Sequence, residues 1–247
     1  MRPSSRVRAT FFLALLIGAC GDEDEARPDA PATPEDHARA AMVRERIAES
    51  GVESGAVLRA MGEVPRHEFV PADQREFAYE DRALPIGHDQ RTSRPSLVAI
   101  MTELAELKPG SRVLEVGTGS GYAAAVLSRI AAEVYTIEII PSLGERARGV
   151  LADLGYDNVH VRVGDGYQGW PDQAPFDAVI ITAAPPKVPQ PLLDQLAPGG
   201  RLVVPEGEVV QQLVLYIRRD DEKGTRFERK PLIGVRFVPM TGEVRRR

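Results

Sequence analysis

Three glycines alternate with other residues directly after a short apolar run of the chain. They are Gly117, Gly119 and Gly121, and the run before them, 113–116, carries an acidic side chain at Glu115. Glycine lets the chain turn sharply where a strand meets a helix, and it lets backbone N–H groups approach a ligand closely. The pattern therefore predicts a site for a nucleotide-like ligand at the end of a strand.

The spacing of these glycines argues against a dinucleotide. The dinucleotide fingerprint G-x-G-x-x-G needs its third glycine at the position where this chain has Tyr122, which disfavours a nicotinamide dehydrogenase. A carboxylate at Glu115 would also repel a pyrophosphate, whereas it would tolerate a ligand with a positive sulfonium and no phosphate. S-adenosylmethionine is such a ligand. We expect it to bind at Glu115, Gly117, Thr118, Gly119 and Gly121.

Two more acidic residues follow the next two apolar runs. Glu138 ends the run 133–138, close to the offset of about 20 residues at which a carboxylate hydrogen-bonds ribose hydroxyls. Asp165 and Gly166 follow the run 159–163. A single carboxylate of this kind is usually a solvated turn residue, but three at the ends of successive strands indicate one shared site. We therefore add Glu138, Asp165 and Gly166 to the cofactor site.

These residues lie within a regular alternation of apolar runs and amphipathic stretches. Continuous apolar strands separated by amphipathic helices are typical of a parallel sheet covered on both faces, with ligands beyond the carboxyl ends of its strands. The segments 209–217 and 227–237 alternate apolar and polar residues and suit antiparallel strands. We expect parallel strands at 113–116, 134–138, 159–163, 176–182 and 202–204, and helices ending near 130, over 141–154 and around 192–196.

The region before residue 109 differs in its pattern. Helical spacing appears over 40–47 and again over 56–61, where Ser54 is a suitable cap. The stretch 84–95 is dense in Pro, Gly and small polar residues, so we expect a loop there. Pro95 then suits the first position of a further helix.

Bulk composition permits a large core and limits the class of partner. The chain has 247 residues, of which 43% are hydrophobic, and a net charge of −5. An acidic chain is a poor candidate for a protein that grips nucleic acid by neutralising phosphates. We expect no nucleic-acid partner, no metal site and a monomer.

The N-terminus has the features of a secretion signal. Arg2, Arg6 and Arg8 precede an unbroken apolar run over 11–17, which is too short to span a bilayer, a task that needs roughly 20 apolar residues. The run ends in small residues before Cys20, the single cysteine of the chain, and resembles the lipobox of bacterial lipoproteins. We expect a lipid anchor on Cys20 and an extracytoplasmic, membrane-anchored protein facing the periplasm or the surface.

From about residue 40 to 240 the chain resembles one family closely, the protein-L-isoaspartate O-methyltransferases. The glycine motif alone marks only a methyltransferase fold, whereas the segments before Pro95 and at 236–239 are specific to this family. The matching segments are Val64–Arg66, Phe69–Val70, Ala83–Gly87, Glu115–Tyr122, Gly164–Gly166, Gly169–Trp170, Pro175–Ala178, Thr182–Pro186 and Arg236–Pro239.

The resemblance implies a Rossmann-like class I methyltransferase fold and a protein-repair activity. Members of the family transfer a methyl group from S-adenosylmethionine to the free carboxylate of an isoaspartyl residue in damaged protein. The ester then closes spontaneously to a succinimide, whose hydrolysis returns some normal aspartate. The expected partners are damaged proteins or peptides that bear isoaspartyl residues.

The family pattern G-x-x-Q-T-I-S-x-P assigns a catalytic role to a serine that corresponds here to Ser93. From the residues alone, Ser93 is equally suited to cap the helix that starts at Pro95. By the same resemblance, Glu138 would hold ribose hydroxyls and Asp165 the adenine end of the cofactor. The implied substrate-binding residues are Ile86, Gln90, Arg236 and Val238.

The chain departs from the family pattern at three positions. Arg91 and Thr92 stand where threonine and isoleucine are usual, and Glu206 replaces a usually apolar residue. With Arg94, Arg91 adds a second positive charge beside the expected carboxylate site. These charges either strengthen the binding of acidic substrates or indicate a shifted specificity.

Together these features divide the chain into four parts. We expect a signal peptide over 1–19, a flexible tether over 20–36, a helical N-terminal extension with the substrate loop over 37–108, and the methyltransferase core with C-terminal strands over 109–247. Region 21–36 is acidic, rich in alanine and proline and lacks hydrophobic periodicity, which is typical of a tether.

Three alternatives stay open. The first is a methyltransferase for another small-molecule or protein carboxylate; methylation of amino groups is disfavoured because the segment 182–186 lacks the Asn or Asp that accepts a hydrogen bond from an amine. The second is a surface-tethered protein that binds the cofactor without turnover. The third is a cytoplasmic location if the N-terminal segment is not a functional signal, since S-adenosylmethionine is made in the cytoplasm.

Overall fold

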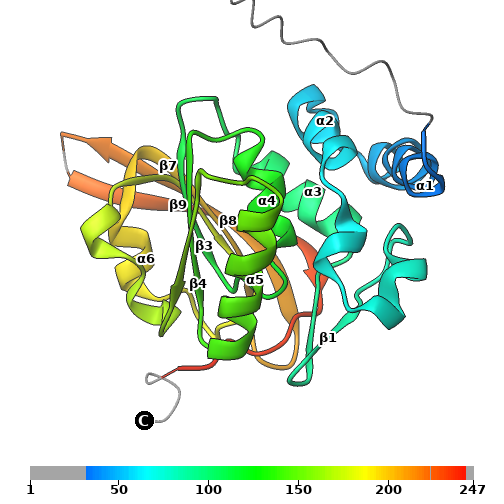
Figure 1. Ribbon diagram of the computed structural model, residues 1–247. Coiled ribbons are helices and arrows are strands. Elements are labelled where there is room, and N and C mark those ends of the chain that lie inside the picture. The colour runs from blue at the N-terminus through cyan, green and yellow to red at the C-terminus, as the bar shows by residue number, and fades with distance from the viewer. Residues whose placement is uncertain (1–31, 223, 243–247) are drawn as a thin grey trace, which may run out of the picture. The chain divides into compact units, whose positions relative to one another are not determined.

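A seven-stranded sheet forms the centre of residues 32–222 and 224–242, the part of the chain described by a computed structural model (Figure 1). Its strands lie in the order β5-β4-β3-β6-β7-β8-β9. The first five are parallel to one another, and β8 and β9 each run antiparallel to the preceding strand. The strands are β3 Arg112–Val116, β4 Glu133–Glu138, β5 Val159–Val163, β6 Phe176–Ile181, β7 Leu196–Glu206, β8 Gln211–Asp221 and β9 Gly224–Val235.

This arrangement confirms the predicted fold class, a mostly parallel α/β sheet with an N-terminal helical region and antiparallel C-terminal strands. The five parallel strands overlap the runs predicted as parallel, although β5 alternates valine with His160 and Arg162, and β8 and β9 overlap the two segments predicted as antiparallel. The helices are α1 Pro34–Met42, α2 Gly55–Glu63, α3 Pro95–Leu104, α4 Tyr122–Ser128, α5 Pro141–Asp153 and α6 Gln190–Asp194.

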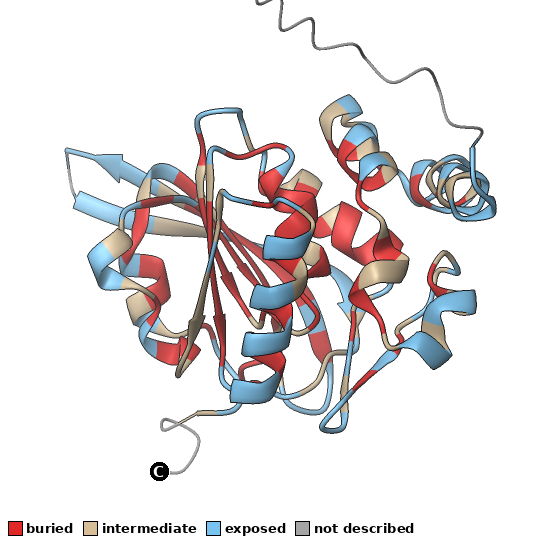
Figure 2. Ribbon diagram, in the orientation of Figure 1, coloured by how far each residue is buried: buried red, intermediate tan, exposed pale blue. Residues whose placement is uncertain are grey.

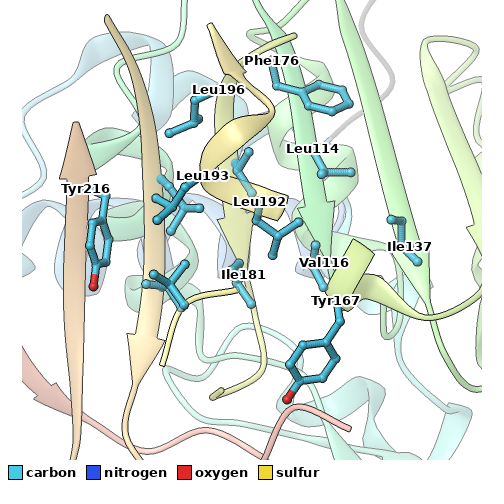
Figure 3. Packing of buried hydrophobic residues seen from close by; sticks show 14 of the residues in the cluster. Leu114, Val116, Ile137, Tyr167, Phe176, Ile181, Leu192, Leu193, Leu196 and Tyr216 are labelled. Atoms are coloured by element: carbon cyan, nitrogen blue, oxygen red, sulfur yellow. The ribbon is translucent and has the colours of Figure 1, made fainter. Parts of the chain in front are cut away.

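Successive residues of each strand point to opposite faces of the sheet, and both faces are covered. On one face, Leu114 and Val116 of β3 pack with Leu192 of α6 and Tyr167, as Figure 3 shows. On the other face, Val113 packs against α3 and α4. The strands are accordingly the buried centre of Figure 2, while the outer face of α5 is exposed. Because packed side chains cover both faces of the sheet, we expect a ligand to bind at the carboxyl ends of the strands.

The N-terminal region packs on α4 and α5 and begins earlier than the sequence predicts. Helix α1 starts at Pro34, inside the range predicted as tether. A capping box holds this start, because Thr33 Oγ1 accepts a hydrogen bond from Asp36 N and the Asp36 carboxylate accepts one from Thr33 N. Residues 1–31 and Cys20 lie outside the described residues. As predicted, Ser54 caps α2, and Pro95 is the first residue of α3.

The stretch predicted as a loop before Pro95 contains a small hairpin, so that prediction is wrong in part. Strand β1, Pro85–Gly87, pairs antiparallel with β2, Gln90–Arg91. His88 and Asp89 form the turn at φ 55° and 56°. A two-residue hairpin turn with positive φ at both central positions usually has Asn-Gly or Asp-Gly there, so the sequence His88-Asp89 did not indicate a turn of this type. The hairpin carries Ile86, which is buried.

Candidate active site

A crevice opens at the carboxyl ends of β3, β4 and β6, beneath the β1–β2 hairpin. It is formed by the glycine turn after β3, the residues after β4 and the segment that follows β9. Its walls are Ile86, Gln90, Arg91, Val116, Gly117, Gly119, Ile137, Glu138, Ile139, Ile140, Leu143, Gly166, Thr182, Ala183, Val238, Pro239, Met240 and Thr241. We call this the cofactor crevice.

The glycine turn is held by backbone and side-chain hydrogen bonds. Gly117 N and Thr118 N donate to Ile137 O at 2.8 and 3.2 Å, and Thr182 Oγ1 donates to Gly117 O at 2.7 Å. Gly117 has φ 104°, and a Cβ there would lie 2.3 Å from Thr182 Oγ1. Only glycine fits this position, because both the backbone angle and the contact exclude a side chain.

Glu138 is the carboxylate that faces the crevice. Its side chain is buried; Oε2 accepts from Gly119 N at 2.8 Å and Oε1 accepts from Ile140 N at 3.0 Å. Two carboxylate oxygens have about four acceptor sites, so each oxygen can accept one more hydrogen bond. Glu138 is therefore fixed in place with acceptors left for a diol, as the sequence predicts for ribose.

Glu115 does not line the crevice, contrary to the prediction of direct contact with the cofactor. It is completely buried beneath the glycine turn, where Thr136 Oγ1 donates to its Oε2 at 2.6 Å and Thr118 Oγ1 lies 2.6 Å from Thr136 Oγ1. Burial raises the pKa of Glu115 to about 8, with a smaller contribution from the charge of Glu138. Burial therefore favours the neutral form of Glu115 near neutral pH, so Glu138, which faces the crevice, is the carboxylate placed to disfavour a phosphate.

Two further predicted cofactor residues support the turn from behind. Thr118 is buried and takes part in the hydroxyl chain to Glu115. Gly121 has φ 89°, and a Cβ there would lie 3.3 Å from Ala147 Cβ and from Leu151 Cδ1 of α5. Neither residue lines the crevice. The Thr118 side chain points into the core, and the absence of a side chain at Gly121 allows α4 to approach α5.

The prediction at the end of β5 is met by Gly166, which lines the crevice. Asp165 is half-buried, and its Oδ1 accepts from Tyr167 N at 2.9 Å, which fixes the turn that presents Gly166. Asp165 is not among the lining residues, so its predicted contact with adenine stays a prediction.

A second, larger cleft adjoins the crevice; we call it the substrate cleft. It has a volume of about 1360 Å³ and includes Ser93. Its walls are Ala83, Arg91, Thr92, Ser93, Arg94, Leu97, Thr182, Glu208, Val209, Val210, Gln211, Gly234, Val235, Arg236, Phe237, Val238 and Pro239. The crevice and the cleft share Arg91, Thr182, Val238 and Pro239. A group seated in one can therefore reach a group seated in the other.

Ser93 lines the cleft and does not cap α3. The cap position is Arg94, and the first turn is held by Asp81, whose carboxylate accepts from Ser96 N and Ser96 Oγ, both at 2.8 Å. Within the described residues, the Ser93 hydroxyl makes no hydrogen bond. The alternative of a capping role is therefore wrong, and the hydroxyl is available to a ligand.

A buried arginine fixes the backbone at Ser93. Arg66 is fully buried and donates to Ala78 O at 2.5 Å, Thr92 Oγ1 at 2.7 Å and Ser93 O at 3.1 Å. Thr92 Oγ1 in turn donates to Ser93 O at 3.0 Å. Burial lowers the pKa of Arg66, but the guanidinium remains charged. Thr92, the departure from the family pattern, is thus an acceptor for Arg66.

The predicted substrate residues lie around the junction of the two hollows. Ile86 and Gln90 line the crevice, Arg236 lines the cleft, and Val238 lines both. Glu206 lines neither hollow. It forms an ion pair with Arg229 at 2.6 Å and accepts hydrogen bonds from Tyr216 Oη and Val188 N. The hydrogen bond from Arg229 lowers the pKa of Glu206. Glu206 is a structural ion-pair residue.

The prediction missed several lining residues of the crevice. Ile139 and Ile140 follow Glu138, and Ile139 is 37% exposed. Two apolar residues directly after the acidic end of a strand were a usable signal, because an exposed isoleucine there suits contact with a flat base. Met240 and Thr182 gave no such signal, because their places depend on the path of the chain after β9 and on the pairing of β6 with β3.

Comparison with known proteins gives a family match over most of the chain. The family described as Protein-L-isoaspartate(D-aspartate) O-methyltransferase (PCMT) matches residues 37–245. A protein-L-isoaspartate O-methyltransferase of Gloeobacter violaceus is 53% identical over 209 residues, which cover 82% of this chain and 98% of that protein. A protein-L-isoaspartate O-methyltransferase 2 of Syntrophobacter fumaroxidans is 46% identical over 256 residues, covering 96% of this chain and 99% of that protein.

Two solved structures are also similar. A protein-L-isoaspartate O-methyltransferase superposes with a TM-score of 0.74 at 32% identity, covering 83% of this chain and 66% of that one. A putative protein-L-isoaspartate O-methyltransferase of Plasmodium falciparum, in complex with S-adenosyl-L-homocysteine, has a TM-score of 0.69 at 24% identity, covering 82% of this chain and 98% of that one. The second likeness is one of fold.

Proposed function

The chain belongs to the protein-L-isoaspartate(D-aspartate) O-methyltransferase family and is an S-adenosylmethionine-dependent protein carboxyl methyltransferase, and we propose that the methyl transfer takes place where the cofactor crevice meets the substrate cleft. The observation that carries this proposal is the shared wall of the two hollows, Arg91, Thr182, Val238 and Pro239, beside Ser93.

The residues of the crevice suit the cofactor. Glu138 offers fixed acceptors for ribose hydroxyls, Ile139 and Ile140 offer apolar surface for the adenine, and the turn at Gly119 allows close approach of the backbone. S-adenosylmethionine, when bound there, supplies an electrophilic methyl group on a sulfonium that leaves as a neutral thioether. Asp165 is proposed to act at the adenine end through the turn that it holds.

The protein has little proton chemistry to perform. A carboxylate with an ordinary pKa near 3.9 is already ionised at neutral pH, so the attacking oxygen needs no general base. We assign to Ser93 the donation of a hydrogen bond that directs one carboxylate oxygen and leaves the other free to attack. Holding the carboxylate oxygen, the methyl carbon and the sulfur in line, to which the Ser93 hydrogen bond adds a small part, can lower the barrier by roughly 7–11 kcal/mol.

Substrate peptides are proposed to lie along the cleft, over Arg236 and Val238, with Ile86 and Gln90 closing the junction above the isoaspartyl group. The direct test compares an isoaspartyl peptide with its aspartyl twin, both incubated with the full-length chain and methyl-labelled S-adenosylmethionine. We expect label only on the isoaspartyl peptide, as a base-labile ester. Equal labelling of the two peptides, or none, would contradict the proposal.

The location of the protein is a separate proposal. We propose that residues 1–19 are a signal peptide and that Cys20 carries a lipid anchor, which places the enzyme outside the cytoplasm as a monomer on a membrane. The support is the sequence pattern, together with the Syntrophobacter fumaroxidans relative, whose match covers 96% of this chain and so extends to the N-terminal side of residue 37. Among residues 32–222 and 224–242, no helix is long and apolar enough to cross a bilayer.

Cell fractionation after labelling with a fatty acid tests this location. The chain should carry the lipid and sediment with membranes, and Cys20→Ala should abolish both. A wild-type chain that stays in the cytoplasmic fraction without lipid would support the alternative that the N-terminal segment is not a functional signal.

A further inference from the structure

Three arginines line the substrate cleft without an acidic partner. Arg91, Arg94 and Arg236 are exposed, and no carboxylate of the described residues lies within 4.0 Å of their guanidinium nitrogens. Arg91 donates only to a backbone carbonyl, Ala83 O, at 2.7 Å. Other exposed arginines of the described residues also lack an ion pair, Arg46 and Arg59 among them, but these lie outside the cleft. The three cleft arginines are therefore available to an anionic ligand.

The charge of the cleft exceeds what one isoaspartyl group can balance. Glu208 is the single acidic residue among the described lining residues, so three positive charges face one negative charge. An isoaspartyl residue brings one free carboxylate, and methylation removes that charge. The remaining positive charge attracts a second anionic group on the same substrate, and in a peptide that group is an aspartate or glutamate side chain.

The positions of the arginines set the distance to this second carboxylate. Arg94 follows Ser93 directly in the chain, and Arg91 precedes it by two residues. An extended peptide advances roughly 3.3 Å per residue, and an arginine side chain spans about two such steps. A carboxylate within two positions of the isoaspartyl residue can thus reach a cleft arginine while Ser93 contacts the isoaspartyl group.

Part of the cleft wall is apolar and suits a polypeptide. Val209 and Val210, in the turn between β7 and β8, are 96% and 79% exposed and line the cleft. Apolar side chains this exposed are covered when a peptide backbone with its side chains lies against them. The cleft therefore offers both charged and apolar surface to a peptide.

We propose that this cleft selects isoaspartyl sites that have an acidic residue within two positions, and that Arg94, with Arg91 and Arg236, recognises that residue. The proposal rests on the proposed function, since it concerns the substrates of the same site. It names a sequence preference of the chain, set by residues that do not take part in the methyl transfer itself.

The test uses a set of isoaspartyl peptides of identical length that carry Glu, Gln or Lys at one flanking position, on either side. With the full-length enzyme at low ionic strength, we expect kcat/KM for the Glu peptide to exceed that for the Gln peptide by about five- to tenfold, with Lys lowest. The difference should lie in KM, because the contact is the same before and during transfer. It should shrink at about 0.5 M salt, where the Debye length is short.

Variants assign the preference to the arginines. Arg94→Gln and Arg236→Gln should each bring the Glu to Gln ratio toward one, and Arg91→Thr should do the same. Arg226→Gln is the matched control, since Arg226 is equally exposed but pairs with Asp221 at the far end of β9. It removes the same charge and should leave the ratio and the basal rate unchanged.

The outcomes separate this proposal from the function on which it rests. Equal kcat/KM for Glu and Gln peptides, or a higher value for Lys, would overturn the preference while leaving the methyltransferase intact. A ratio that Arg226→Gln lowers as much as Arg94→Gln does would also overturn it. Absence of label on every isoaspartyl peptide would overturn the function and the preference together.

Discussion

The cofactor crevice and the substrate cleft share a wall but differ in how they are built. The crevice is formed by a glycine turn and by Glu138, a buried carboxylate whose two oxygens both accept backbone hydrogen bonds. The cleft has many exposed side chains in its wall, and that of Arg94 makes no hydrogen bond or ion pair within the described residues. A cofactor is the same molecule in every turnover, so a rigid site suits it. Damaged proteins differ from one another, and an open, adaptable surface suits them.

The largest expected effect lies in the rigid part. Gly117→Ala places a Cβ 2.3 Å from Thr182 Oγ1 at φ 104°, so the turn must rearrange. We expect the affinity for S-adenosylhomocysteine, measured by calorimetry, to fall by about 100-fold or more. The matched control is Gly149→Ala in α5, where no atom lies within 4 Å. It should raise the free energy of unfolding by about 0.5–1 kcal/mol and leave affinity unchanged.

The next effect concerns the buried acid under the crevice. The pKa of Glu115 rises from 4.5 to about 8 on folding. Below pH 4.5 both states are protonated; above it the unfolded state loses its proton first, so the contribution of Glu115 to stability declines as pH rises toward 8. The free energy of unfolding of wild type, relative to Glu115→Gln, should therefore fall by about 2 kcal/mol from pH 6 to pH 8. Urea titrations at each pH measure it, and a constant difference would show that Glu115 is ionised.

The third effect separates catalysis from binding at the junction. Ser93→Ala removes one hydrogen bond to a charged substrate group, so kcat should fall by about 10- to 100-fold while cofactor affinity is kept. Ser96→Ala is the contrasting variant, because Ser96 bonds to Asp81 at the start of α3. Its loss should lower the melting temperature and affect kcat much less. If Ser93→Ala lowered the melting temperature and left kcat nearly unchanged, Ser93 would have a structural role instead.

The smallest effect lies behind Ser93. Thr92→Val keeps the shape of the side chain but removes the acceptor for Arg66 and the donor to Ser93 O. We expect a destabilisation of about 1–2 kcal/mol, because Arg66 Nη2 loses its shortest hydrogen bond and keeps only the longer ones to Arg82 O and Ser93 O, with a fall in kcat of a few fold. Urea unfolding and initial rates measure the two. Unchanged stability would mean that Arg82 O and Ser93 O are sufficient acceptors for Arg66 Nη2.

Much of the fold followed from the sequence because its signals are local. Continuous apolar runs at β3, β4 and β6 indicated parallel strands, and the carboxylate at the end of β4 lies where strand ends meet. The hairpin at 85–91 did not follow, since His88 and Asp89 adopt positive φ without the usual glycine. The hairpin is held by residues of α5, because Arg146 donates to Ile86 O and Ser142 Oγ lies 2.7 Å from His88 Nε2.

The errors at the site have a common cause, which is burial set by distant residues. Glu115 was expected to act through its charge, but desolvation beneath the turn keeps it neutral. Ser93 was equally suited to cap α3, but Asp81, fifteen residues before Ser96, takes that place. Arg66 gave no sign of complete burial, because its four acceptors come from segments that only the fold brings together.

A crystal structure with S-adenosylhomocysteine and an isoaspartyl peptide tests the central claim most directly. The account predicts ribose hydroxyls within hydrogen-bonding distance of Glu138, the peptide along the cleft over Arg236, and its isoaspartyl carboxylate next to Ser93 Oγ, facing the sulfur across Thr182. A nucleoside bound away from Glu138, or a peptide carboxylate that does not reach the junction, would contradict it.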